Sequence, residues 1–203
     1  MLLIQDGASC IPIVRALATF SGAIAGLLMI LVGSMLPSAL LVPIIATPPK
    51  VLIISSNWQI PALLLCALVS GPRAGVIASV AYITIGLFYL PIFHGGGGIS
   101  YLTQPGFGYL VGFVPAAWIS GQLSKQARMN NFLFLTVSAL AGLIILHIFG
   151  ITRLSIGSLF NLWQEKFSEL FFSYSLSPLT SQLSLCPAIG VIAFSMRRIL
   201  LVK

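Results

Sequence analysis

The chain has 203 residues, of which 58% are hydrophobic and only 6% are charged. A soluble domain carries about 25% charged residues, so 10 basic and 3 acidic side chains cannot cover a water-exposed surface of this size. The composition therefore excludes a soluble globular protein, and it also excludes disordered and fibrous classes, which need polar or repetitive sequence. We expect an integral membrane protein.

Charged residues divide the chain into long charge-free stretches, and one membrane span needs about 20 apolar residues. The stretch from Ala74 to Ser124 is broken by Pro91 and the glycines after it, so it holds two spans. We predict an all-α integral membrane fold over residues 1–203, a single six-helix bundle with an outward-facing ligand pocket. The predicted helices cover residues 13–36, 58–70, 75–90, 105–123, 132–149 and 183–201.

Residues 155–172 differ from these spans because apolar side chains such as Ile156 and Trp163 alternate with polar ones such as Glu165 at helical spacing. The segment is predicted either to lie flat at the membrane surface or to be a plain connecting helix.

The distribution of Lys and Arg predicts the orientation, because cytoplasmic loops carry the excess of positive charge. With both termini in the cytoplasm, seven basic residues lie inside and three lie outside. We therefore predict a multi-pass protein of the cell membrane with cytoplasmic termini. The inside set is Arg15, Arg73, Lys125, Arg128, Arg197, Arg198 and Lys203, and the outside set is Lys50, Arg153 and Lys166.

Several function classes lack the residues that they need. The net charge of +7 follows the topology and forms no basic patch with aromatic readers, so no nucleic-acid partner is expected. No Walker A motif, catalytic triad or Cys/His metal spacing occurs, so we expect neither an enzyme nor a metal site. No span holds an acidic residue, which disfavours ion-coupled transport by this chain alone. His147 is interpreted as a packed neutral histidine rather than a proton relay.

The stretch from Gly71 to Gly121 is the most informative. Gly108, Gly112, Ala116 and Ser120 form a ladder of small residues that predicts close helix packing. Four glycines, Gly95 to Gly98, follow His94 and form either a flexible turn or a backbone cradle over a ligand. The helix expected to begin near Pro105 would point free N–H groups toward the outside, where they attract a carboxylate. Aromatic residues surround this point in the sequence.

The first predicted helix carries Ala18, Gly22 and Gly26 at a spacing of four. Such a stripe serves either internal packing or contact with a partner helix.

An ordered set of motifs in this region resembles a known family. It comprises Gly71-Pro72-Arg73-x-Gly75, Tyr82, Gly86, Leu90-Pro91-x-Phe93, Gly95-Gly96 and Pro105-Gly106-x-Gly108-Tyr109-Leu110-x-Gly112-Phe113. In these motifs the chain is similar to the BioY proteins, the biotin-capturing S components of energy-coupling-factor (ECF) transporters. The resemblance is strong over the second to fourth predicted helices and weaker elsewhere.

The resemblance implies biotin as the transported substrate and no resident cofactor. Glutamines would meet the ureido group, aromatic rings would enclose the ligand rings, and the glycine loop with His94 would hold the carboxylate. The implied substrate-binding residues are Gln59, Tyr89, Phe93, His94, Gly95, Gly96, Gly97, Tyr101, Gln104, Tyr109 and Gln182.

The family also implies partners, since this chain has no ATPase of its own. They are a transmembrane coupling (T) protein and two cytosolic ABC-type ATPases, and docking on the T protein would use Ala18, Gly22 and Gly26. One departure matters: Gln182 and Leu185 stand where many family members have an aspartate and a lysine. An S component for another small vitamin and a non-transporting membrane scaffold therefore stay as alternatives.

Overall fold

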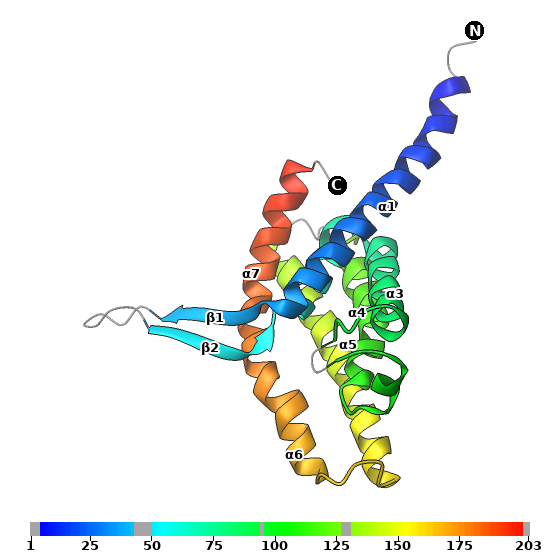
Figure 1. The fold of residues 1–203 in the computed structure, drawn as a ribbon. Coiled ribbons are helices and arrows are strands. Elements are labelled where there is room, and N and C mark those ends of the chain that lie inside the picture. Colours follow the sequence, from blue (N-terminus) through cyan, green and yellow to red (C-terminus); the bar gives the residue numbers. More distant parts are fainter. Residues whose placement is uncertain (1–4, 43–49, 94–95, 127–130, 201–203) are drawn as a thin grey trace.

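The computed structural model describes residues 5–42, 50–93, 96–126 and 131–200, with the backbone alone considered for residues 5–12, 37–42 and 50–56. Long helices dominate the described chain and run side by side in a bundle (Figure 1). The helices are α1 (Gln5–Met35), α2 (Gln59–Ser70), α3 (Pro72–Phe88), α4 (Phe107–Leu123), α5 (Phe132–Leu159), α6 (Phe167–Phe171) and α7 (Ser177–Ile199), with a 3-10 helix η1 (Ile99–Thr103) and a π-helical turn η2 (Phe172–Leu176).

Helix α2 is the centre of the bundle. It contacts α1, α3, α4, α5 and α7, and every residue from Pro61 to Val69 is buried. A helix that is apolar on all sides is stable only when other helices surround it. The neighbouring helices therefore each pack one apolar face against α2 and leave the opposite face on the outside of the bundle.

Small residues allow these helices to approach closely, as lipid-embedded packing requires. A Cβ atom placed on Gly75 would lie 2.9 Å from Cβ of Ala67 in α2, and one on Gly112 would lie 3.1 Å from the carbonyl oxygen of Leu146 in α5. Ala116 and Ser120, on the same face of α4, are fully buried. The predicted role of this ladder in helix packing is confirmed.

Three helical segments are long and apolar enough to cross a membrane: Ile13–Met35, Phe132–Leu159 and Phe167–Ile199. Helices α2, α3 and α4 are shorter apolar helices of 12, 17 and 17 residues. The beginning of α1 and the end of α7 lie at the same end of the bundle (Figure 1), which we call the terminal end. The opposite end, where α6 lies and the chain enters α2, is called the hairpin end.

The prediction of an all-α chain misses one element. Between α1 and α2, strand β1 (Pro37–Val42) pairs antiparallel with β2 (Lys50–Asn57), with Leu40 opposite Leu52 and a register irregularity between Pro37 and Ala39. This hairpin projects sideways beside α7 (Figure 1). Prolines that end a helix leave the backbone in extended conformations, and here two such segments pair with each other.

The predicted single amphipathic segment at residues 155–172 is also wrong. Helix α5 continues to Leu159, a turn follows, and the remainder is α6 and η2. Helix α5 can continue beyond Arg153 because the charged side chain has partners. Its guanidinium donates a hydrogen bond to the carbonyl oxygen of Leu102 at 3.1 Å and lies 5.5 Å from the ring of Trp163. Helix α7 begins at Ser177, six residues earlier than expected.

Candidate functional site

The loop after α3 folds back over the hairpin end of that helix. The buried ring of Phe93 lies 5.5 Å from the ring of Tyr82 and 4.7 Å from that of Tyr101. The backbones of Phe93 and Gly96 exchange hydrogen bonds of 2.8 and 3.0 Å, and the Tyr82 hydroxyl donates one of 3.0 Å to the carbonyl oxygen of Ile92. We call Tyr82, Phe93 and Tyr101 the aromatic cap.

Glycine is required at two points of this loop. Gly96 and Gly98 have φ values of +136° and +86°, a region that other residues rarely adopt. The N–H of Gly98 donates to the carbonyl oxygen of Gly86 at 2.9 Å, and a Cβ on Gly97 would lie 2.5 Å from Cα of Pro91. The described glycines therefore pack against the end of α3. His94 and Gly95 lie outside the described residues, so their ligand contacts remain predictions.

A second group of polar side chains lies among α4, α5, η2 and α7. Nε2 of His147 is 2.9 Å from Oε1 of Gln182, and both side chains are buried. The hydroxyl groups of Tyr109 and Ser175 are hydrogen-bonded to each other. The Tyr109 ring lies edge-on to His147 with ring centroids 5.7 Å apart. We call Tyr109, His147, Ser175 and Gln182 the polar cluster.

Gln59 lies at the same depth as the polar cluster. Leu64 of α2 lies against Gly142 of α5, where an added Cβ would approach its Cδ2 to 2.7 Å. The two helices are antiparallel, so five residues before Leu64 and five after Gly142 reach the same level, and these positions are Gln59 and His147. Nε2 of Gln59 is buried and has no hydrogen-bond partner among the described residues.

Tyr174 connects the aromatic cap with the polar cluster. Its ring stacks on that of Tyr109 at 6.4 Å, and both Tyr174 and the hydroxyl of Tyr101 border Gly106 at the start of α4. Burial raises the pKa of Tyr101 to about 12, so this phenol stays neutral at physiological pH. The acidic side chains with described positions, Glu165 and Glu169, are exposed. The arrangement is a neutral set of donors, acceptors and ring faces at the hairpin end.

Two predicted ligand residues lie outside both groups. Tyr89 is 77% exposed at the end of α3, and Gln104 is exposed before α4. The structure thus places Phe93, Gly96, Gly97 and Tyr101 in the loop after α3 and joins Tyr109 and Gln182 through His147. Gln59 is level with that cluster, whereas Tyr89 and Gln104 lie at the surface.

The glycines of the α1 stripe contact the rest of the bundle. A Cβ on Gly22 would lie 2.7 Å from Cβ of Ser70, and one on Gly26 would overlap the side chain of Cys66. Ala18 is exposed, as are Ser21 and Ala25. The two glycines are thus used for packing on α2 and α3, whereas docking at Ala18 stays a prediction.

Sequence reasoning did not assign His147, Tyr174 and Ser175 to the site. His147 was interpreted as a packed histidine, and it is buried, but it pairs with a glutamine that the sequence analysis had placed in the site. A polar side chain in an apolar span is the signal that could have found it. Tyr174 and Ser175 fall in a segment for which no ligand role was considered.

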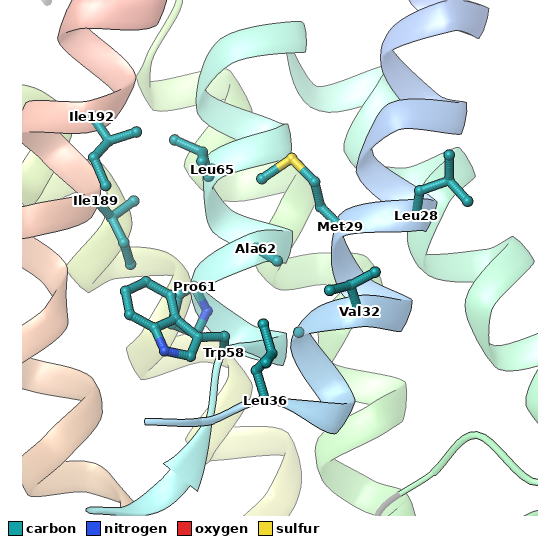
Figure 2. Close-up of a pocket in the computed structure, with 11 residues that line it drawn as sticks. Leu28, Met29, Val32, Leu36, Trp58, Pro61, Ala62, Leu65, Ile189 and Ile192 are labelled. Carbon is teal, nitrogen blue, oxygen red and sulfur yellow. The ribbon is translucent and has the colours of Figure 1, made fainter. Parts of the chain in front are cut away.

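An apolar groove of about 400 Å³ lies elsewhere, between α1, α2 and α7 (Figure 2). Figure 2 shows Val32 and Met29 of α1 facing Ile189 and Ile192 of α7, with Trp58 between them near the hairpin. A second cavity of about 520 Å³ lies along α4 and α5 beside Arg153. The walls of the groove between α1, α2 and α7 are almost entirely apolar, so a polar ligand there would lose most of its hydrogen bonds to water without replacement. In the described parts of the chain, no three His, Cys, Asp or Glu side chains form a possible metal site.

Comparison with known proteins gives consistent similarities. The model of the BioY family matches residues 18–201. The chain is 31% identical to a probable biotin transporter BioY of Lysinibacillus sphaericus, over 66% of this chain and 69% of that protein. It is 33% identical to a biotin transporter BioY of Thermotoga maritima, over 46% of this chain and 54% of that one.

A solved structure has the same fold. It is the S-component for biotin from an ECF-type ABC transporter, and it superposes with a TM-score of 0.65 at 20% sequence identity, covering 98% of this chain and 95% of that one.

Proposed function

The chain belongs to the BioY family, and from this membership we infer that it is the biotin-binding S component of an ECF-type transporter. Its biotin-transporter relatives and its helical S-component fold support this function. The structural observation that carries it is the neutral polar cluster at the hairpin end, which adjoins aromatic rings and contains one buried atom, Nδ1 of His147, without a hydrogen-bond partner among the described residues.

Biotin matches this chemistry. Its ureido group has two N–H donors and one carbonyl acceptor, so Gln59 and Gln182 are suited to bind it. Its thioether ring is apolar and is suited to pack against Tyr109 and the aromatic cap. Backbone N–H groups of the glycine loop and the start of α4 are suited to a carboxylate tail. A protein that binds and releases a ligand unchanged needs no catalytic group.

The orientation in the membrane follows from charge. We place the terminal end in the cytoplasm, because the described basic residues Arg15, Arg73, Lys125, Arg197 and Arg198 belong to that side, against Lys50, Arg153 and Lys166 on the other. We count six spans, α1 to α5 and α7. The hairpin end, with the ligand site, then faces outward in the cell membrane. Helices α2, α3 and α4 are short for spans, but each is apolar and in contact with the long helices.

Import needs energy that this chain does not supply. Its sequence has no Walker A motif, and no acidic residue lies within Ile13–Met35 of α1 or within the other helices counted as spans. We therefore propose that a transmembrane coupling protein and two cytosolic ATPases drive delivery. The exposed surface of α1 around Ala18 is the proposed docking site, since small residues allow a partner helix to approach closely.

The test is a binding panel with the purified chain and labelled vitamins. We expect saturable binding of biotin and none of the other vitamins. One observation favours a second candidate, an S component for another small vitamin: Gln182 and Leu185 stand where the family commonly has charged residues. Saturable binding of a different vitamin would support that candidate. A co-purified polypeptide with no vitamin bound would instead indicate a membrane scaffold.

A further inference from the structure

His147 is buried, with 6% of its surface exposed, and one of its ring nitrogens has no hydrogen-bond partner among the described residues. Its Nε2 is 2.9 Å from Oε1 of Gln182. In this assigned orientation of the Gln182 amide, the oxygen faces the ring and can only accept, so the hydrogen of the bond lies on Nε2 of the imidazole. The tautomer is thereby fixed, and Nδ1 is left as the second ring nitrogen, without a partner in the described parts of the chain.

The imidazole is neutral in this setting. A protonated ring would be a buried cation, which is costly unless an acid pairs with it. The acidic side chains with described positions, Glu165 and Glu169, are exposed in the segment before η2, and the imidazole contacts the Tyr109 ring and Gln182. Nδ1 of the neutral ring is therefore a bare acceptor.

An unsatisfied donor lies at the same depth of the bundle. Nε2 of Gln59 is buried and unpartnered in the described residues, and helix register places Gln59 level with His147. Buried polar atoms in folded proteins nearly always have a partner, so two unsatisfied atoms at one level need an explanation. A ligand N–H would satisfy Nδ1 of His147, and a ligand carbonyl oxygen would satisfy Nε2 of Gln59.

We propose that His147 determines specificity for a ligand ring that contains an N–H group next to a carbonyl group. Nδ1 of His147 accepts the ring N–H, and Nε2 of Gln59 donates to the ring carbonyl oxygen. Gln182 is a positioning residue that holds the imidazole in the tautomer that accepts. The inference rests on the proposed function, because the ureido ring of biotin is the group of this kind.

The consequence is selectivity against substitution at one ring nitrogen. A methyl group on that nitrogen removes the donor and leaves Nδ1 of His147 unsatisfied, so binding should weaken about 10- to 100-fold. In the His147→Leu variant no acceptor remains to be left empty. In this variant, methylation of the ligand should lower the binding affinity by less than about threefold, although the variant binds biotin itself about 10- to 100-fold more weakly than wild type does.

The experiment is a binding cycle with the purified full chain, using biotin and two analogues that are each methylated on one of the two ureido nitrogens. Desthiobiotin, which keeps the ureido group but lacks the sulfur, is the control ligand, and its penalty should be equal in wild type and variant. Ser138→Ala is the control protein, because Ser138 is buried on α5 and bonds within its own helix to the carbonyl oxygen of Phe134.

A third variant tests the positioning role of Gln182. Gln182→Met removes the acceptor that fixes the tautomer, so the discrimination between biotin and the methylated analogue should fall, whatever happens to the absolute affinity. If Gln182 only fills space, this ratio stays as in wild type.

The outcomes separate the two claims. Equal methylation penalties in wild type and His147→Leu, for both analogues, would overturn the role of His147 while biotin binding stands. Failure of folded wild-type protein to bind biotin would overturn the proposed function itself. If His147→Leu does not fold, the wild-type comparison still decides: no penalty from methylation at either nitrogen contradicts the inference.

Discussion

Arg197 in the last turn of α7 donates a hydrogen bond of 2.9 Å from Nη1 to the carbonyl oxygen of Ser124, the residue that ends α4. Arg197 is 5% exposed. The bond joins the terminal ends of two helices and places a cation at the negative end of the α4 dipole. The positive charge of this one side chain therefore offsets the negative end of the α4 dipole.

Replacing Arg197 should destabilise the protein. Arg197→Leu leaves the Ser124 carbonyl without its donor and removes the charge from the helix end, which costs about 1–3 kcal/mol. Arg198→Leu is the control, because Arg198 is exposed and lies over the ring of Phe194, a contact worth about 0.5–1 kcal/mol. Thermal unfolding in detergent should show the larger loss of stability for Arg197→Leu. Equal losses of stability would contradict a stabilising role for the hydrogen bond between Arg197 and Ser124.

Gln59 should show opposite effects on stability and binding. Gln59→Leu removes a buried donor that has no partner among the described residues, so the ligand-free protein should be unchanged or more stable by up to about 1 kcal/mol. The same change should weaken biotin binding by about 1–3 kcal/mol. Gln104→Leu is the matched control at an exposed glutamine and should change binding little. Loss of stability together with unchanged binding would show that Gln59 is structural.

Neighbouring residues of α1 should differ sharply. Gly26→Ala places a methyl group against Cys66 and should destabilise by about 1–3 kcal/mol, whereas Ala25→Val, on the exposed side, should stay within about 0.5 kcal/mol of wild type. Thermal unfolding measures both. Equal stability of the two variants would show that α1 does not pack on α2 through this glycine.

Docking on a coupling protein predicts a separation of binding from uptake. Ala18→Leu enlarges an exposed position, so the chain alone should keep its stability and its biotin affinity. Coupled uptake in cells should fall several-fold because the partner helix can no longer approach. Gly22→Leu should reduce both biotin binding and coupled uptake, since Gly22 packs on Ser70. Normal uptake by Ala18→Leu would place the docking surface elsewhere.

Membrane orientation can be tested with single cysteines in a background without the native ones. Ser100 in η1 and Gln126 after α4 are both exposed and lie at opposite ends of α4. A membrane-impermeant maleimide should label Ser100→Cys in intact cells, and Gln126→Cys only after permeabilisation. The reverse pattern would put the ligand site in the cytoplasm and contradict outward capture.

The sequence predicted the positions of the central helices to within a few residues, because Gly71-Pro72 and the loop from Pro91 to Pro105 interrupt otherwise continuous apolar runs. It did not predict the hairpin, since extended pairing of residues 37–57 depends on two segments meeting in space. It ended α5 too early because a charge normally marks a span end. The Arg153 side chain instead reaches Leu102 and Trp163 and lets the helix continue.

Only part of the candidate site could be predicted from the sequence. Residue types and the family resemblance identified Gln59, Tyr109 and Gln182 as candidates. His147 and Gln182 are separated by 35 positions, and their contact follows only from the packing of α5 against α7. Exposure could not be read from the sequence either: Tyr89 and Phe93 lie four residues apart, yet the first is 77% exposed and the second 5%.

The central claim is that this chain alone, without nucleotide or partner proteins, captures biotin. Equilibrium binding of radiolabelled biotin to the detergent-purified chain tests it most directly, with cooperative thermal unfolding as proof of the folded state. We predict saturable binding at one biotin per chain that excess unlabelled biotin displaces. Folded protein that shows no saturable, displaceable binding would contradict the account.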